Sequence, residues 1–387
     1  MKATNTALGS FGTTIFTVMS ALAVEHGAIN LGQGFPDEDG PEPVRRAAAE
    51  AILAGPNQYP PMAGLPILRQ AVAQHAQRFY DLAVDWQTEV LVTSGATEAL
   101  ADCFFGLIEP GDEVVLIEPL YDAYLPLVLR AGGVPRLVRM TPPDWALPVA
   151  ALEAAFSPRT KLLVLNSPNN PSGKVFTADE LRFIAELAQR WDAYVVCDEV
   201  YEHLVFGGLR HIPLMTLPGM RERCVRIGSA GKTFSLTGWK VGMITAPPPL
   251  LSAIAKAHQF TTFTTVPALQ IAVATGLGLD DSYFNGLARA LVAKRDRLSR
   301  GLEAAGLPVL PAQGTYFLTV DVGAAGFNGT DEAFCRTITE AAGVAAVPVS
   351  AFYADTPPAG FARFCFCKRD EVLDEASRRL GRYFGRA

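Results

Sequence analysis

The chain has 387 residues, which is enough for two or three compact units. Hydrophobic residues make up 49% of the chain and charged residues 19%, an ordinary globular composition that excludes a disordered chain or a coiled coil as the main state. The net charge is −6 and no block of Lys and Arg occurs, so we expect no nucleic-acid surface.

We expect no membrane or export signal in the N-terminal segment. Residues 15–24 are weakly apolar, but Thr17 and Ser20 interrupt the run, which is too short to span a bilayer. The six cysteines form no CxxC pair, as is typical of buried free thiols in a reducing compartment. We therefore expect a cytoplasmic protein without a membrane partner.

Short apolar runs alternate with helical patterns through the middle of the chain. Strands are predicted at residues 89–93, 113–117, 162–165, 194–197, 225–228 and 242–246. Helices are predicted at residues 98–107, 178–191 and 267–277. Because the strands are continuously apolar, both faces of their sheet should be covered by helices. The pattern predicts an α/β domain with a mostly parallel sheet over residues 45–282.

The texture of the sequence changes after residue 282. A long helix is predicted at residues 283–305, followed by strands at 307–320 and 361–366 and a C-terminal helix, which together make a smaller α+β domain over residues 283–387. Residues 1–44 contain Gly and Pro turns and have no evident sheet partner of their own. We expect this N-terminal segment to pack on the C-terminal domain.

Polar residues gather where the predicted strands end, which is where open α/β sheets bind ligands. Residues 92–98 include Ser94 and Gly95 and would suit an anion at a helix N-terminus, although alone they read as an ordinary capped helix entry. Residues 166–173 are nearly all turn formers, and by themselves they indicate a loop with spare amides.

Two further strand ends carry charged residues. Asp198 follows a buried strand, where a carboxylate is costly unless a cation or donors meet it, so it is either half of a salt bridge or the partner of a protonated ring nitrogen. Lys232 lies among small residues and is either a nucleophilic amine or a solvated charge. Only two residues separate Gly228 from Gly231, so this segment is not a Walker A loop.

The order and spacing of these segments resemble the fold-type I, class I/II aminotransferases, which use pyridoxal phosphate. The resemblance covers nearly the whole chain and implies a mostly parallel, seven-stranded-type sheet with a smaller α+β domain. Within the family, the motifs look similar to methionine aminotransferases and kynurenine/glutamine aminotransferases. The motifs that carry this closer likeness are LGQGFPD at 31–37, NQY at 57–59, NNPSGKVF at 169–176 and RFCF at 363–366.

The resemblance assigns the groups around the cofactor ring. It implies that Lys232 forms the Schiff base and then moves the substrate proton, both suited to an amine. Asp198 would keep the pyridinium nitrogen protonated, so that the ring can accept electrons. Asn170 and Tyr201 would hydrogen-bond the ring hydroxyl, and Tyr121 would stack on the ring face.

The resemblance also assigns the phosphate site and a partner subunit. The phosphate would bind the backbone of Ala96 and Thr97, with Ser229 and Lys240 adding a hydroxyl and a charge. Tyr59 would reach the phosphate of the other subunit, which implies a homodimer with shared active sites.

The substrate would be an amino acid exchanging its amine with a 2-oxo acid. Arg363 would bind the α-carboxylate through its planar donors, helped by Gly34 and Asn170, and Phe16 would contact the substrate. No arginine stands at a motif position for a distal carboxylate, which favours methionine, glutamine and aromatic donors over acidic ones. The residues expected near the side chain by resemblance are Phe16, Tyr59, Tyr121, His258 and Phe263.

Three alternatives differ from this reading. An aminotransferase for N-succinyldiaminopimelate is the main one within the class. A cysteine-S-conjugate β-lyase would use the same cofactor and release a group from the β-carbon. A regulator with an aminotransferase-like effector domain would need a fused DNA-binding module, for which the N-terminal residues lack length and basic charge.

Overall fold

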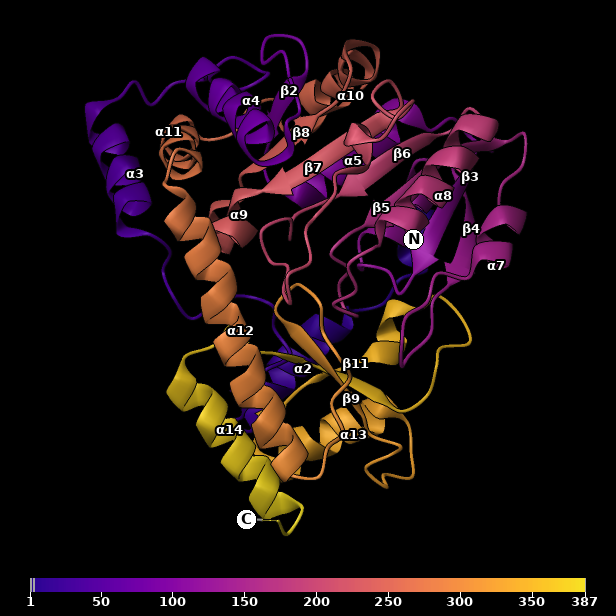
Figure 1. Cartoon of the computed structure of the whole chain (residues 1–387), viewed down its shortest axis with the longest axis vertical. Helices are drawn as coiled ribbons and strands as arrows, with labels where there is room; N and C mark the ends of the chain where they lie inside the picture. The colour runs from indigo at the N-terminus through magenta and orange to yellow at the C-terminus, as the bar shows by residue number, and fades with distance from the viewer. Residues whose placement is uncertain (1, 3, 387) are drawn as a thin grey trace.

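A seven-stranded sheet forms the centre of the larger part of the molecule (Figure 1). The computed structural model describes Lys2 and residues 4–386. The strand order is β2-β8-β7-β6-β5-β3-β4, and β8 alone runs antiparallel to its neighbours. The strands are β2 (Val90–Thr93), β3 (Glu113–Glu118), β4 (Val134–Arg139), β5 (Thr160–Asn166), β6 (Tyr194–Asp198), β7 (Cys224–Ser229) and β8 (Gly242–Thr245).

Alternate residues of the central strands face two separate cores. Val164 and Val196 join the core that contains α5 and α10, whereas Leu163 and Val195 join the one that contains α8. This two-sided burial explains why the strands read as continuous apolar runs, and it confirms the predicted α/β fold. The helices of this part are α3 (Glu42–Ala54), α4 (Pro66–Tyr80), α5 (Ala96–Leu107), α6 (Tyr124–Arg130), α7 (Val149–Ala154), α8 (Ala178–Arg190), α9 (Ala230–Thr233), α10 (Pro248–Thr261) and α11 (Pro267–Leu277).

The edge strand β4 is absent from the sequence-based prediction. It contains Pro135 and two arginines, and its first four residues alternate between exposed and half-buried positions, so that only Val138 is fully buried. An edge position tolerates proline and charge because one side of the strand needs no partner. The composition that suits an edge therefore hides the strand from a search for apolar runs.

The C-terminal part contains a small antiparallel sheet in the order β11-β12-β9. Its strands are β9 (Phe317–Asp321), β11 (Val347–Pro348) and β12 (Phe361–Cys365), and its helices are α12 (Asp281–Ala304), α13 (Asp331–Thr337) and α14 (Asp370–Tyr383). The predicted strand at 307–320 is too long, because Val309 and Gly314 form only isolated bridges before β9 begins. Helix α12 runs from the level of α9 and α11 down to α14 (Figure 1).

The N-terminal segment does have a sheet partner, contrary to the prediction. It comprises α1 (Thr6–Gly9), α2 (Ile15–Glu25) and β1 (Ile29–Asn30), and β1 pairs in parallel with β10 (Val344–Ala345). Two residues are too few to show a strand pattern in the sequence. The division into residues 1–44, 45–282 and 283–387 stays a prediction.

Short helical turns complete the described chain. They are η1 (Leu214–Thr216), η2 (Thr237–Trp239), η3 (Ile338–Ala342) and η4 (Val349–Phe352). Within residues 2 and 4–386, no helix combines the length and the apolarity needed to cross a membrane.

Candidate active site

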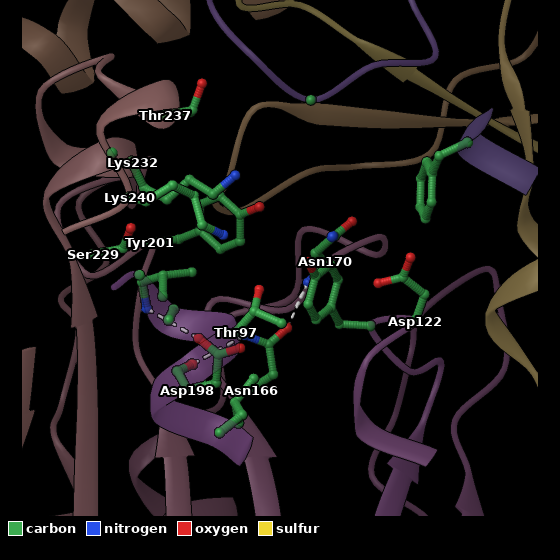
Figure 2. A pocket seen from close by; sticks show the side chains of 18 of the residues that line it. Thr97, Asp122, Asn166, Asn170, Asp198, Tyr201, Ser229, Lys232, Thr237 and Lys240 are labelled. Carbon is green, nitrogen blue, oxygen red and sulfur yellow. Dashed lines mark hydrogen bonds between the residues drawn. The ribbon is translucent and has the colours of Figure 1, made fainter. Parts of the chain in front are cut away.

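A cavity of about 330 Å³ opens at the carboxyl ends of the parallel strands (Figure 2). Asn166, Asp198 and Ser229 are the last residues of β5, β6 and β7, and Asn166 pairs in register with Asp198. Parallel strands therefore bring these distant residues to one edge of the sheet. Twelve of the predicted site residues line the cavity: Phe16, Gly34, Ala96, Thr97, Tyr121, Asn170, Asp198, Tyr201, Ser229, Lys232, Lys240 and Arg363.

Lys232 projects into this cavity from α9, directly after β7. Its Nζ donates to the Tyr316 hydroxyl at 3.0 Å, and that hydroxyl donates to the Gly34 carbonyl oxygen at 2.7 Å. Burial lowers the pKa of Lys232, which favours the neutral amine. A neutral amine with a free lone pair is the form that attacks a carbonyl carbon or accepts a proton.

Asp198 lies at the floor of the cavity with 5% of its surface exposed. The Tyr124 hydroxyl donates to its Oδ2 at 2.5 Å, and the Val200 backbone N–H donates to its Oδ1 at 3.4 Å. Burial raises the pKa of Asp198, while the hydrogen bond from Tyr124 and the charge of Lys232 oppose that rise. A cationic ring nitrogen beside this carboxylate would supply the opposite charge that burial demands.

The N-terminus of α5 forms one wall of the cavity. Its N-cap is Gly95, at φ +90°, so no side chain caps the first turn, and Gly95, Ala96 and Thr97 all line the cavity. A Cβ on Gly95 would lie 3.3 Å from Nζ of Lys240, so the glycine leaves room for the ammonium beside the helix end. Free N–H groups, a hydroxyl from Ser229 and an ammonium make a suitable phosphate site.

Arg363 lies deep in the site, with 1% of its surface exposed. One of its terminal nitrogens donates to Asn170 Oδ1 at 2.8 Å and the other to the Gly32 carbonyl oxygen at 2.6 Å. Within the described chain, its Nε has no hydrogen-bond partner. Burial lowers the pKa of Arg363 to about 10, so the guanidinium is still a cation at neutral pH.

Aromatic rings surround that guanidinium. Its carbon lies 3.9 Å from the ring centroid of Phe317, 5.0 Å from that of Phe352 and 5.2 Å from that of Phe16. A Cβ on Gly34 would lie 2.6 Å from the Phe317 ring, so only glycine allows the N-terminal segment to approach this closely. The result is a cation held in an apolar pocket, which favours binding of a carboxylate.

Three residues expected around the substrate, Tyr59, His258 and Phe263, do not line the cavity of this chain. Tyr59 is 83% exposed, and its ring packs edge-on against Phe263 at 5.6 Å. His258 is fully buried behind α5, where its Nδ1 lies 2.7 Å from Glu98, so its expected place near the substrate side chain is wrong. The Tyr59 assignment depends on a second subunit and stays a prediction.

Several cavity residues escaped the sequence analysis. Asn166 links two strand ends, because its amide donates to the Asp198 carbonyl at 3.0 Å and its Oδ1 accepts from the Asn170 N–H at 2.9 Å. Asp122 faces the same space as Asn170 in Figure 2. Both lie inside or beside the motifs, so the strand-end argument could have found them. Tyr124 and Tyr316 show no local signal, because their partners lie far away along the chain.

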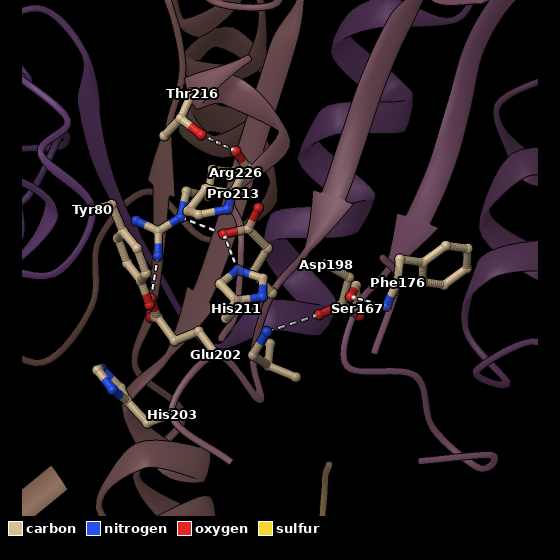
Figure 3. A network of polar contacts seen from close by, with 12 residues as sticks. Tyr80, Ser167, Phe176, Asp198, Glu202, His203, His211, Pro213, Thr216 and Arg226 are labelled. Carbon is tan, nitrogen blue, oxygen red and sulfur yellow. Dashed lines mark hydrogen bonds and ion pairs between the residues drawn. The ribbon is translucent and has the colours of Figure 1, made fainter. Parts of the chain in front are cut away.

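A second polar cluster lies behind Asp198, on the other side of β6 (Figure 3). Arg226 pairs with both Glu199 and Glu202, and Nε2 of His211 lies 3.0 Å from Glu199. We call these four residues the β6 ion-pair network. Because Glu199 directly follows Asp198, this network fixes the end of β6 on which Asp198 stands.

The donor set fits pyridoxal phosphate, the cofactor implied by the resemblance. The cavity provides an amine, a buried carboxylate for a cationic ring nitrogen, and a helix N-terminus with a lysine for a phosphate. When bound, this cofactor supplies an aldehyde that condenses with amines and a ring that withdraws electrons.

The comparisons with known proteins agree with this chemistry. The family described as aminotransferase class I and II matches residues 26–380. A probable N-succinyldiaminopimelate aminotransferase from Mycobacterium tuberculosis is 47% identical, with 96% of each chain covered. The methionine aminotransferase of Escherichia coli is 40% identical, also with 96% of each chain covered.

Solved structures show the same likeness along the whole chain. The N-succinyldiaminopimelate aminotransferase from Mycobacterium tuberculosis has a TM-score of 0.95 and 46% identity, covering 98% of this chain and 99% of that one. An Escherichia coli structure described as having a methionine aminotransferase function also has a TM-score of 0.95, with 40% identity and coverage of 99% and 100%. The chain therefore belongs to the class I and II aminotransferases, and it is an aminotransferase that depends on pyridoxal phosphate.

Proposed function

We propose that the enzyme transfers the amino group of an L-amino acid with an uncharged side chain, such as methionine, glutamine or an aromatic amino acid, to a 2-oxo acid. Charge in the cavity carries this proposal. Three basic side chains line it, namely Lys232, Lys240 and Arg363. Lys232 is assigned to the reaction, Lys240 to the cofactor phosphate and Arg363 to the α-carboxylate. Among the described residues that line the cavity, no further basic side chain is left for a distal carboxylate.

The other lining groups favour the same substrates. Asp122 adds a carboxylate to the space that a side chain would enter, and it would repel a distal carboxylate. Phe16 and Phe317 supply apolar surface, on which a thioether or a ring gains burial. The amide of glutamine is uncharged and can donate to Asp122.

Each role rests on the groups already described. Nζ of Lys232 removes the proton from the α-carbon, an act that burial assists by keeping the amine neutral. Tyr316 orients that amine by accepting from it. Asp198 balances positive charge on the ring nitrogen, and Arg363 with Asn170 orients the α-carboxylate so that the Cα–H bond faces Lys232. The cofactor ring would be bound by Tyr201 and Tyr121. The cofactor phosphate would be bound by Ser229, Lys240, Ala96 and Thr97.

We also propose a homodimer in the cytoplasm. The exposure of the Tyr59 ring supports its role as a contact between subunits. Other apolar side chains are exposed as well, including Phe260, with 86% of its surface exposed, and Phe263, with 41%. Exposed aromatic side chains that gather on one face are typical of a protein–protein contact surface. The six cysteines are all buried and free, which suits a reducing compartment.

A second candidate, N-succinyldiaminopimelate as substrate, is favoured by the 47% identical relative of that probable activity. Its succinyl carboxylate would need a cation that one chain does not place in the cavity, so a neighbouring subunit would have to supply it. This candidate differs from the first in the charge that the side-chain pocket accepts.

A donor panel separates the two candidates. We expect kcat/KM with one fixed 2-oxo acid to be higher for methionine, glutamine and phenylalanine than for aspartate and glutamate. The same panel includes N-succinyldiaminopimelate. If the acidic donors or the succinylated substrate exceed methionine, the uncharged-substrate proposal falls while the aminotransferase assignment stands.

A further inference from the structure

Three buried ionisable residues meet behind the phosphate-binding end of α5. His258 on α10 is completely buried, and its Nδ1 lies 2.7 Å from Oε1 of Glu98 and 3.5 Å from Oδ2 of Asp102. Glu98 and Asp102 stand one turn apart on α5, so both carboxylates face the same imidazole. None of these three residues lines the cavity.

The contacts of the ring define its protonation. Nε2 of His258 lies 3.2 Å from the Met62 carbonyl oxygen, which can only accept, so this nitrogen carries a hydrogen. Nδ1 faces a carboxylate oxygen, which also only accepts when ionised. The ring is therefore an imidazolium. Burial alone would lower the pKa of His258, but the neighbouring carboxylates of Asp102 and Glu98 raise it to about 9.

The cluster contains more acceptors than donors. Neither carboxylate oxygen of Asp102 has a hydrogen-bond partner in the part of the chain that the structure describes. Burial raises the pKa of Asp102 to about 6, so at neutral pH much of this group is ionised. One imidazolium thus faces two carboxylates, and its loss would leave a buried double negative charge.

The same cluster holds the turn between β2 and α5. Glu98 accepts from the Ser94 N–H and from the Thr262 hydroxyl, and the Ser94 hydroxyl lies 3.0 Å from that of Thr265. Glu98 is the third residue of α5, directly after Ala96 and Thr97. Glu98 therefore lies within one helical turn of the proposed phosphate site, so that a shift of its side chain or an uncompensated charge on it would change that site.

We propose that His258 is a positioning residue for the cofactor phosphate. Its imidazolium offsets one of the two negative charges of Glu98 and Asp102, so that the free N–H groups at the N-terminus of α5 have one uncompensated negative charge behind them rather than two. This inference rests on the proposed assignment of the phosphate to that helix end. It predicts that His258 contributes to binding of the phosphate and not to binding of the pyridine ring.

The test compares two probes on the cofactor-free protein, pyridoxal phosphate and pyridoxal, which lacks the phosphate. In His258→Gln the amide can donate to a carboxylate but carries no charge. We expect the Kd for pyridoxal phosphate to rise at least 10-fold, while the Kd for pyridoxal changes less than twofold. The double variant His258→Gln/Glu98→Gln removes one charge of each sign and should recover most of the phosphate preference. His26→Gln, at an exposed position, is the matched control.

Several results would overturn the proposal. One such result is an unchanged Kd for pyridoxal phosphate in His258→Gln. Another is an equal rise of the Kd values for pyridoxal phosphate and pyridoxal in that variant. If His258→Gln does not fold, the double variant decides, and loss of its phosphate preference contradicts the inference. A stoichiometric divalent metal in the wild-type protein that is lost in His258→Gln would show a metal site in place of the imidazolium. A wild-type protein that binds both probes equally would instead refute the proposed phosphate site itself.

Discussion

The cavity and the β6 ion-pair network lie on opposite sides of one strand end, and they differ in how completely their buried charges are paired. In the network, Arg226 pairs with two carboxylates, Glu199 and Glu202. In the cavity, Arg363 donates to an amide and to a carbonyl oxygen, but it forms no ion pair with a carboxylate of the described residues, and its Nε has no hydrogen-bond partner among them. Because an incompletely paired buried charge is costly, this contrast indicates that the cavity charges are kept for a ligand, whereas the network charges stabilise the fold.

The largest effect is expected at the reacting amine. Lys232→Ala removes the group that bonds the cofactor and moves the α proton, so we expect turnover to fall at least 10³-fold, since general-base catalysis alone supplies roughly 10²–10⁴-fold. Single-turnover kinetics with methionine would measure this loss. The exposed Lys256→Ala is the control and should stay near wild-type activity. A Lys232→Ala protein that turns over normally would remove the lysine from the mechanism.

The neighbours Asp198 and Glu199 provide the sharpest test of the contrast between the two regions. Asp198→Asn keeps the shape but removes the charge that balances the ring nitrogen, and we expect kcat to fall on the order of 10³-fold, or about 4 kcal/mol in barrier. Glu199→Gln should instead lower the free energy of unfolding by roughly 1–3 kcal/mol, because it weakens the buried pair with Arg226.

Steady-state kinetics and urea unfolding on both variants measure these two effects. Each variant is the control for the other. Asp198→Asn should lower kcat with little change in the free energy of unfolding, whereas Glu199→Gln should lower the free energy of unfolding with little change in kcat. If both variants lose activity and stability in the same proportion, the two clusters form one structural unit and the contrast is wrong.

A smaller effect is expected at the guanidinium. Arg363→Lys keeps the charge but loses the planar fork, which serves Asn170, Gly32 and a carboxylate together. The lost charged hydrogen bond of roughly 1.5–3 kcal/mol predicts a 10- to 150-fold fall in kcat/KM, mostly through KM. The exposed Arg182→Lys is a matched control. An unchanged KM would mean that Arg363 does not bind the substrate.

The smallest effect concerns stability and pH. His75 and His203 lie beside Glu202, with their Nε2 atoms 2.7 Å apart, and burial lowers the pKa of His75 to about 3 and that of His203 to about 4. Below pH about 6.5 the unfolded chain therefore binds protons that the folded chain does not, and the fold loses stability as the pH falls.

We expect each histidine to cost roughly 1 kcal/mol between pH 6.5 and 5.5. Thermal unfolding from pH 7.5 to 5 would show this fall, and His203→Gln should reduce its slope. Because neither histidine lines the cavity, cofactor binding should not follow the same curve. A slope that is identical in His203→Gln would mean that other groups set the acid sensitivity.

Much of the fold and the site could be predicted from local sequence. The buried strands can be recognised in the sequence as apolar runs, and the small, amide-bearing or charged residues at their ends indicate the cavity. The edge strand β4 could not be found, because Pro135 and its arginines suit an edge and not a core. The β1–β10 pair is only two residues long, and its pairing depends on distant packing.

The same distinction holds within the site. Lys232 and Asp198 stand in motifs, so their chemistry can be inferred from their neighbours along the chain. Tyr316 and Tyr124 contact these two groups from distant parts of the chain, and no periodicity or spacing marks them. His258 shows the converse error, since the family resemblance suggested substrate contact, whereas α10 turns it toward Glu98.

The most direct test of the central claim is to find which amine the cofactor occupies. Borohydride reduction of the holoenzyme, followed by peptide mapping, fixes the cofactor to the lysine that it bonds. The account predicts a single pyridoxyl label on Lys232, the cavity amine whose one hydrogen-bond partner among the described residues is the Tyr316 hydroxyl. A label on Lys174, which is paired with Glu180, or on the exposed Lys256 would contradict the claim that the cavity forms the reaction centre, and a label on Lys240 would contradict the assignment of the reacting amine to Lys232.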